Sequence, residues 1–498
     1  MNQEPSNTDY FLLEYLEKKY QLQRKSSMYM AAKILLQRLW QGSICIPVKE
    51  ITDFDTCEYK KSGILGAAGD VCPFILDGEN LYIQRYFYYQ KRIIEIIEKL
   101  QKTGRLHIIT GSPGTGKTTS LARTLAEEYV KRNREPKIML AAPTGKAAFR
   151  MNEALKKSLV YDDSKKHTHW LKDISQSIIE KLNTLESKTI HRLLGYRHLS
   201  INFIHTKENP LDADIVVIDE CSMVDLPMMS KLLDAIPDND CMLYLLGDKN
   251  QLASVEAGSV FADICGKFAN DESIYTELTE NHRAKFAPGI IDLSLQILRK
   301  SIENPENDNV HFKGALSLEN MADEYRGFFN SVDEKEALEM LDTFQILCAV
   351  KKGKNGTENI NKELLIKARA GNAKFTPIIV SENNYQINLF NGDIGVMDTE
   401  KAYFLNGSEI RQFPLLTLPK YDSAFAITIH KSQGSEYSRI AVVYPEKGQE
   451  IDNTGTIFTR ELLYTAITRA RLECNIYGSL ELIKNSCKKE IYRASGIK

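Results

Sequence analysis

The feature that most constrains this chain is a glycine-rich segment, GSPGTGKT, at residues 111–118. It fits the phosphate-binding pattern GxxxxGK[ST], in which glycines let the backbone wrap phosphates and successive N–H groups point at them. That pattern requires a strand before the loop and a helix after it. The apolar run Leu106–Thr110 precedes the segment, and Leu121, Leu125 and Tyr129 follow it at helical spacing. The context therefore favours a nucleotide site over a glycine-rich turn with a surface lysine.

Each residue type in this loop has an expected task. The ammonium of Lys117 is expected to reach the β- and γ-phosphates of ATP, and the hydroxyl of Thr118 is expected to bind Mg²⁺. Backbone N–H groups at the helix start add positive potential. The predicted nucleotide-binding residues of the loop are Gly111, Ser112, Pro113, Gly114, Thr115, Gly116, Lys117, Thr118 and Thr119.

Two later strand ends place polar groups where such a site needs them. The apolar run Ile215–Ile218 ends in Asp219 and Glu220. Behind a phosphate loop, Asp219 would hold Mg²⁺ and Glu220 would polarise the attacking water. The next apolar run, Met242–Leu246, is followed by Gln251, whose amide would report the γ-phosphate to the rest of the protein. Either strand end alone would be interpreted as an ordinary polar turn. Their interpretation as parts of a nucleotide site depends on the phosphate loop that precedes them.

The chain divides into segments of different pattern. Residues 1–85 have the apolar spacing of amphipathic helices and carry no catalytic signal. From 86 to 295, buried-type strands alternate with helical periods, which is typical of an α/β fold with a parallel sheet. A second such series, over 296–498, includes Phe344–Val350, Ile378–Val380, Ile440–Val443 and Asn475–Tyr477. Turn signals around 375–424 predict a small β insertion in this second unit.

Length and composition add limits. With 498 residues, the chain is expected to form two to four domains. Its net charge of −2 argues against a protein that coats nucleic acid by bulk charge, but not against a local basic groove. Nine scattered cysteines without metal-ligand spacing indicate reduced, buried thiols. No signal peptide or membrane-spanning run is recognisable, so we expect a cytoplasmic protein.

An ordered set of motifs carries a resemblance to a known family. The motifs are GSPGTGKT (111–118), APTGKAA (142–148), TIHRLLG (189–195), VVIDECSMVD (216–225), GDKNQL (247–252), LTENHRA (278–284), TIHKSQGSEY (428–437) and YTAITRAR (464–471). The set resembles superfamily 1 helicases of the 5′→3′ group, and within that group the RecD family, the alpha subunits of exodeoxyribonuclease V. Matches at 42–47, 346–353 and 389–396 extend the resemblance over nearly the whole chain.

The resemblance implies a fold and further nucleotide contacts. It implies two RecA-like P-loop NTPase domains with parallel sheets, a small SH3-like β insertion at 375–424 and a helical N-terminal domain. Arg283 and Arg469 look like the two γ-phosphate arginines, whose guanidinium groups bind phosphate oxygens bidentately. Glu436 matches the position that contacts the ribose, and Gln90 is a candidate reader of the adenine edge, although its surroundings depart from the family's glutamine motif.

The same resemblance implies a DNA-binding set. Contacts to the sugar-phosphate backbone suit a translocating motor, because base readout would stall it. Ordinary polar clusters at strand ends are the alternative for each segment. The predicted DNA-binding residues are Pro143, Thr144, Gly145, Lys146, His191, Arg192, Thr428, His430, Lys431 and Ser432.

These features predict an ATP-dependent 5′→3′ DNA helicase, with direction implied by the resemblance alone. The family's nuclease lies in its beta subunit, and this chain has no acidic cluster with nuclease spacing outside the ATP site. We therefore expect it to act on single-stranded DNA and duplex ends beside RecB- and RecC-like partners, in double-strand break repair and recombination. The N-terminal segment would then be a docking module.

Three alternatives stay open at this point. A free-standing RecD-like helicase would be expected to carry a longer N-terminal extension. A P-loop ATPase that is not a helicase, such as a nucleotide kinase or an AAA-type assembly factor, would lack the two arginine motifs. A structural subunit with an inactive motor would not need Lys117, Asp219 and Glu220 intact.

Overall fold

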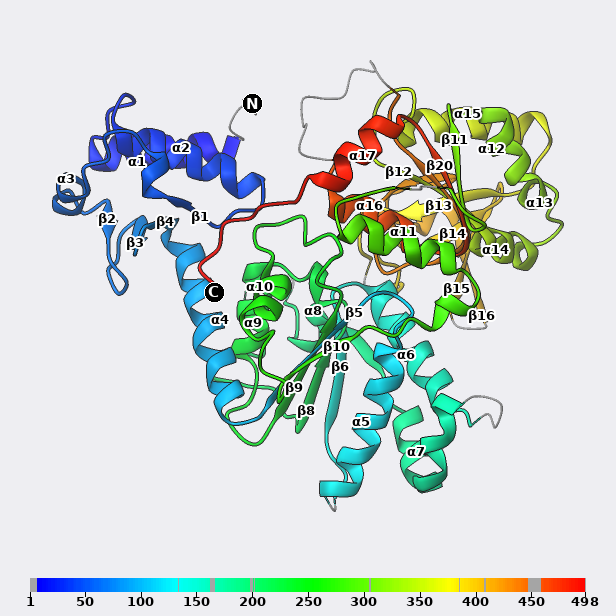
Figure 1. Cartoon of the computed structure of the whole chain (residues 1–498), viewed down its shortest axis with the longest axis horizontal. Helices are drawn as coiled ribbons and strands as arrows, with labels where there is room; N and C mark the ends of the chain where they lie inside the picture. The colour runs from blue at the N-terminus through cyan, green and yellow to red at the C-terminus, as the bar shows by residue number, and fades with distance from the viewer. Residues whose placement is uncertain are drawn as a thin grey trace.

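The structure, a computed structural model, describes residues 7–132, 134–161, 166–197, 200, 202–303, 306–384, 386–406, 409–446 and 458–497. Within these ranges the chain forms four β-sheets (Figure 1). Two are parallel and are covered by helices on both faces, and two are small. No helix in the described ranges is long and apolar enough to cross a membrane.

The N-terminal unit combines the predicted helices with a sheet that the apolar spacing did not predict. Leu13 and Leu16 of the first helix and Leu35 of the second are buried in one hydrophobic core, as the apolar spacing predicts. The small sheet has the order β1-β4-β3-β2. The elements are α1 (Asn7–Tyr20), α2 (Ser27–Trp40), β1 (Cys45–Pro47), α3 (Thr56–Lys61), β2 (Leu65–Gly66), β3 (Phe74–Asp77) and β4 (Asn80–Ile83).

The first large sheet is parallel throughout, with the order β10-β5-β9-β8-β6-β7. Its strands are β5 (Leu106–Gly111), β6 (Ile138–Ala142), β7 (Ser187–Thr189), β8 (Ile215–Ile218), β9 (Met242–Gly247) and β10 (Tyr275–Leu278). One face packs against α4 (Gln84–Lys102), α9 (Leu226–Asp234) and α10 (Val260–Lys267). The other packs against α5 (Lys117–Arg132), α6 (Gly145–Ser158) and α7 (Gln176–Asn183), while the short α8 (Ile190–Leu193) follows β7.

The second large sheet is also parallel, with the order β11-β20-β19-β12-β18. Its strands are β11 (Val310–Gly314), β12 (Phe344–Cys348), β18 (Ala426–Thr428), β19 (Tyr437–Val443) and β20 (Ala470–Tyr477). One face carries α11 (Pro288–Leu298), α16 (Arg460–Ile467) and α17 (Leu480–Lys488). The other carries α12 (Leu318–Glu324), α13 (Arg326–Phe329), α14 (Glu334–Thr343) and α15 (Thr357–Ala370).

The remaining sheet is antiparallel, with the order β16-β15-β14-β13-β17, and is inserted between α15 and β18. Its strands are β13 (Thr376–Val380), β14 (Ile394–Met397), β15 (Lys401–Asn406), β16 (Glu409–Pro414) and β17 (Tyr421–Ser423). The small β insertion predicted around 375–424 is confirmed, and Ile378–Val380, which the sequence also counts in the second parallel series, belongs to this insertion instead. A short apolar run reads alike in either kind of sheet, and here its neighbours are the antiparallel β14 and β17.

Candidate active site and DNA interface

The phosphate loop connects β5 to α5 and depends on its glycines. Gly114 and Gly116 have φ of 89° and 80°, in the left-handed region that glycine adopts without strain. A Cβ at Gly114 would lie 2.8 Å from Arg283 Cγ and Nε, so the arginine lies directly on the loop. Lys117 begins α5, and its Nζ donates to the carbonyl oxygens of Gly111 at 2.7 Å and Ser112 at 3.2 Å. The lysine thus spans the mouth of the loop.

The two carboxylates follow β8 at the carboxyl edge of the same sheet. Asp219 Oδ1 accepts a hydrogen bond from the Glu220 backbone N–H at 2.8 Å. Burial and, after it, the charge of Glu220 raise the pKa of Asp219 to about 6, while the charge of Lys117 opposes the rise. Glu220 has φ of 53°, a left-handed conformation that costs a non-glycine residue of order 1 kcal/mol. This turn holds the two carboxylates beside each other, with Asp219 within charge reach of Lys117.

Gln251 connects the first sheet with the second unit. Its Nε2 donates to Asp248 Oδ2 at 3.2 Å, and both side chains are buried. The same Oδ2 accepts a hydrogen bond from the Tyr464 hydroxyl of α16 at 3.0 Å. The backbone N–H of Leu252 donates to Thr465 Oγ1 at 2.9 Å. The segment after β9 is therefore hydrogen-bonded to α16, as a residue that relays nucleotide state would need to be.

Arg283 lies between the phosphate loop and the second unit. The preceding Asn281 donates from Nδ2 to Ser112 Oγ at 3.1 Å and to Pro113 O at 2.9 Å, which anchors this segment on the loop. Arg283 Nη1 donates to Thr468 O at 3.4 Å, and Nη2 forms an ion pair with Glu436. The arginine thus contacts both halves of the candidate site.

Arg469 is almost fully buried, with 2% of its surface exposed. Its Nε donates to Thr465 O and its Nη1 to Ser435 O, both at 3.1 Å. Its Nη2 is buried and has no acceptor in the described part of the chain. Burial lowers the pKa of Arg469, and the nearby charges of Glu220 and Glu436 oppose that shift. A buried guanidinium nitrogen without an acceptor is costly, and a phosphate oxygen is the ligand that its geometry and charge fit.

Glu436 is engaged differently from its prediction as a ribose contact. Burial raises its pKa, but the guanidinium of Arg283, and more weakly that of Arg469, hold the pKa below its ordinary value. The carboxylate therefore lies between the two arginines as their counter-charge. A ribose contact would require it to leave Arg283.

The prediction for Gln90 is not supported by its surroundings. Gln90 is buried in α4, where its Nε2 donates to the Tyr82 hydroxyl at 3.4 Å and its Oε1 accepts from the Gly496 backbone N–H at 2.6 Å. Both ends of the amide are thus occupied by the protein. The family motif was only loosely matched there, and packing against the C-terminal segment accounts for this glutamine instead.

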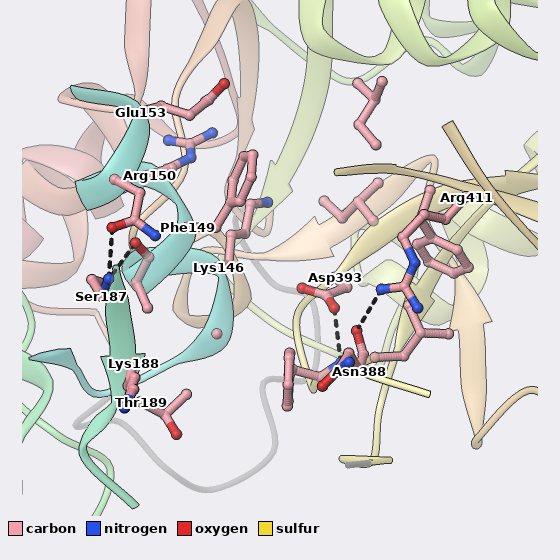
Figure 2. Close-up of a pocket in the computed structure, with 18 of the residues that line it drawn as sticks. Lys146, Phe149, Arg150, Glu153, Ser187, Lys188, Thr189, Asn388, Asp393 and Arg411 are labelled. Carbon is pink, nitrogen blue, oxygen red and sulfur yellow. Dashed lines mark hydrogen bonds between the residues drawn. The ribbon is translucent and has the colours of Figure 1, made fainter. Parts of the chain in front are cut away.

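Three of the ten predicted DNA-binding residues line one interdomain cavity of about 610 Å³ (Figure 2). They are Gly145 and Lys146, the first two residues of α6, and Arg192 of α8. Figure 2 shows Lys146 and Arg150 on one side and Asn388, Asp393 and Arg411 of the β insertion on the other. Aromatic side chains also line the cavity beside the cations, including Phe149, Phe390 and the largely buried Tyr437. Cations interleaved with aromatic rings suit single-stranded nucleic acid.

Residues 143–145, at the start of α6, also have a structural role. Thr144 caps α6, its Oγ1 accepting from the Ala147 N–H at 3.2 Å, and Pro143 immediately precedes it. A Cβ at Gly145 would overlap the ring of Phe390, so the glycine permits close approach of the β insertion.

The other predicted DNA contacts do not line this cavity in the described structure. His191 packs edge-on against Phe203, with ring centroids 5.7 Å apart, and burial lowers its pKa. Ser432 is fully buried and donates to Ile429 O. Lys431 pairs with Asp422 at 3.1 Å, and its backbone N–H donates to Thr428 Oγ1 at 3.3 Å. His430 is exposed in the same turn as Lys431.

Sequence reasoning missed several residues of these sites. Arg150 lies one helical turn after Lys146, and that i, i+4 spacing is a signal that could have placed it on the same face. Arg411 and Phe390 had no such signal, because only the folded β insertion brings them to α6. The contact of Tyr464 with Asp248 likewise joins residues far apart in the chain.

Comparisons with known proteins agree with this architecture. The "AAA domain" family matches residues 94–257, and the "UvrD-like helicase C-terminal domain" family matches residues 423–477. The chain is 31% identical to the RecBCD enzyme subunit RecD of Mycobacterium tuberculosis, covering 78% of this chain and 70% of that protein. It is 28% identical to the Mycolicibacterium smegmatis subunit RecD, covering 95% and 93% of the two chains.

A more distant relative and one solved structure complete the comparison. The ATP-dependent RecD2 DNA helicase of Deinococcus radiodurans is 26% identical over 74% of this chain and 46% of its own length. A solved structure of Bacteroides Pif1 helicase with ADP-AlF3 and single-stranded DNA covers 80% of this chain and 93% of that chain, with 18% identity and a TM-score of 0.43.

Together, the two parallel sheets, the phosphate loop and the RecD and RecD2 relatives define an ATP-dependent DNA helicase. The chain belongs to the RecD family.

Proposed function

We propose that ATP is hydrolysed at a site shared by two motor domains, residues 86–295 and 296–498. Lys117 and the phosphate loop bind the phosphates, Glu220 activates water, and Gln251 senses the γ-phosphate. Arg283 and Arg469 stabilise the charge on the transferring group. The observation that supports this most strongly is the buried Arg469 Nη2, which has no acceptor in the described structure and lies within charge reach of Glu220.

The residues for a magnesium ion are Thr118, at the start of α5, and Asp219, after β8. Mg²⁺ bound there would neutralise charge on the phosphate oxygens. The oxygen ligands and the closeness of Asp219 to Lys117 support this assignment.

We further propose that closure of the two motor domains around ATP moves the protein 5′→3′ along one DNA strand. The basic and aromatic cavity beside Lys146 supports a DNA path there, and the remaining predicted contacts rest on the resemblance. Two hydrogen bonds join the segment of Gln251 to α16, one from the Tyr464 hydroxyl to Asp248 and one from the Leu252 N–H to Thr465 Oγ1, and they supply a route from ATP state to domain movement.

The direction is tested with duplexes carrying a single-stranded tail at one end. Strand separation is expected from a 5′ tail and not from a 3′ tail, with blunt duplex as the control. Unwinding from the 3′ tail alone would reverse the proposed polarity while leaving the ATP site assignment intact.

The subunit partners are proposed to be RecB- and RecC-like chains, because the two RecD relatives reported above are named as RecBCD subunits. The N-terminal unit offers a surface for docking: on α1, Phe11 and Tyr15 are 71% and 48% exposed and lie one helical turn apart. Exposed aromatic rings at adjacent positions are typical of an interface centre.

Docking is tested by co-purification of the full chain with RecB- and RecC-like subunits. Phe11→Glu with Tyr15→Glu is expected to lose the complex without changing the thermal unfolding of the isolated chain. Val71→Glu, in the same unit and 95% exposed, is the matched control and should keep it. Full recovery of the complex with the double variant would contradict docking through α1.

DNA affinity is expected to depend on pH through Lys146. Its surroundings lower its pKa to about 7, chiefly by burial and then by Arg150, while Asp393 and Asp342 oppose the shift. Phosphate binds the ammonium form, which exists below that pKa, so affinity should weaken above pH 7 by up to about tenfold per unit. Fluorescence anisotropy with single-stranded DNA at pH 6 to 8.5 measures this. The Lys146→Arg variant should bind DNA with an affinity that is nearly independent of pH. If its affinity depends on pH as strongly as that of the wild type, a group other than Lys146 causes the pH dependence.

A further inference from the structure

The C-terminal segment after α17 leaves the second motor domain and crosses to the junction of the N-terminal unit with the first sheet (Figure 1, red). There the Ile44 N–H donates to Ala494 O at 2.9 Å, and the Ala494 N–H donates to Ser43 Oγ at 3.1 Å. Ser495 Oγ donates to Asp263 of α10 at 2.8 Å. Ala494 and Ile497 are buried in the same core as the helices of the first sheet. We call residues 489–497 the strap.

Arg493 joins the strap to the loop that follows Gln251. Its Nη1 donates to three backbone carbonyl oxygens, those of Ser254 at 2.8 Å, Glu256 at 3.2 Å and Gly258 at 2.8 Å. It forms no ion pair within 4.0 Å among the residues that the structure describes. Burial lowers its pKa, and the more distant charges of Asp263 and Glu461 oppose this. A charged guanidinium held by carbonyl oxygens fixes the course of the loop that supplies them.

That loop, residues 252–258, begins immediately after Gln251. Its first residue is held from the second motor domain: the Leu252 N–H donates to Thr465 Oγ1, and Gln433 Nε2 donates to Leu252 O, both at 2.9 Å. Its other end is held by Arg493. The loop is therefore hydrogen-bonded at its first residue to the second motor domain and at its other end to the strap, and only a few of its residues lie between these contacts.

The N-terminal unit joins the same junction through Gly42. The Gly258 N–H donates to Gly42 O at 2.8 Å. Gly42 has φ of 89°, and a Cβ there would overlap the Arg493 guanidinium. The absence of a side chain at Gly42 leaves the space in which Arg493 reaches the three carbonyl oxygens. The N-terminal unit, the loop and the strap therefore all meet at Arg493.

We propose that Arg493 is a positioning residue for ATP hydrolysis: it fixes the 252–258 loop, and through it Gln251, against the strap and the N-terminal unit. This rests on the proposed role of Gln251 as the γ-phosphate sensor. A consequence is that the N-terminal unit contacts the sensor loop directly, through Gly42 and Gly258.

The test is a double-mutant cycle on DNA-stimulated ATP hydrolysis by the full chain. Arg493→Gln keeps an N–H donor, but the donor lies two atoms closer to the backbone and the charge and the planar fork are lost, so it cannot hold the three carbonyl oxygens. A small displacement of a reacting group can lower turnover by about tenfold or more. We expect kcat to fall by about tenfold with the affinity for a non-hydrolysable ATP analogue unchanged. Because Arg493 acts through Gln251, the Gln251→Ala variant and the Gln251→Ala/Arg493→Gln variant should have the same kcat.

Controls separate the possible results. Tyr492→Ala, at an exposed neighbouring position of the strap, should keep the wild-type kcat. If Arg493→Gln does not fold, Arg493→Lys replaces it in the cycle. Wild-type kcat in the Arg493 variant, or independent losses that multiply in the double variant, would overturn the positioning role. Full turnover in Gln251→Ala alone would instead overturn the sensor assignment on which the inference rests.

Discussion

Lys117→Ala is expected to abolish ATP hydrolysis, with a loss of about 10²–10³-fold or more, while the protein stays folded. The side chain reaches across the phosphate loop, and its contacts there are the carbonyl oxygens of Gly111 and Ser112. Its ammonium is therefore available to phosphate, and its removal leaves the apolar core untouched. Release of phosphate, measured with saturating single-stranded DNA, checks the result.

Lys156→Ala is the matched control for this prediction. It removes an exposed lysine from α6, away from the loop, and should hydrolyse ATP at the wild-type rate. Both variants should unfold at the wild-type temperature. Hydrolysis by Lys117→Ala at more than a tenth of the wild-type rate would contradict the proposed role of the phosphate loop.

Glu220→Gln should bind ATP normally but turn it over roughly 10²–10⁴-fold more slowly, the range expected when a general base is lost. The amide has nearly the same shape, so the left-handed backbone at this residue, with φ of 53°, need not change. Loss of the charge also removes a group that raises the pKa of Asp219, so that carboxylate titrates lower in the variant. Single-turnover hydrolysis together with nucleotide binding separates the two steps.

Glu272→Gln, at an exposed position before β10, serves as the charge-matched control. A turnover rate in Glu220→Gln equal to that of Glu272→Gln would remove Glu220 from the chemical step. A loss of nucleotide binding equal to the loss of turnover would assign it to binding instead.

Those parts of the fold with strong local patterns were predictable. The apolar runs that form β5, β8 and β9 are buried on both faces, and the helices that follow them have clear apolar stripes. The N-terminal sheet was missed because strands such as β2, of two residues, leave no period to detect. Ile378–Val380 was assigned to the wrong sheet because its partners, β14 and β17, are set by tertiary pairing.

The candidate site was predictable where a motif fixes both residue type and backbone. The phosphate loop and the Asp219–Glu220 pair are of this kind, and the structure brings them to one edge of the first sheet. The surroundings of Gln90 were not predictable, because its partner Gly496 lies at the far end of the chain. The course of the strap was not predictable either, because its contacts are with residues far away in the sequence.

The central claim is that ATP hydrolysis at the interdomain site is coupled to DNA. The most direct measurement is ATP hydrolysis by the purified chain, alone and with RecB- and RecC-like subunits, in the presence and absence of single-stranded DNA. The account predicts strong stimulation by DNA that disappears in Lys117→Ala. Hydrolysis at the same rate with and without DNA, in both preparations, would contradict it.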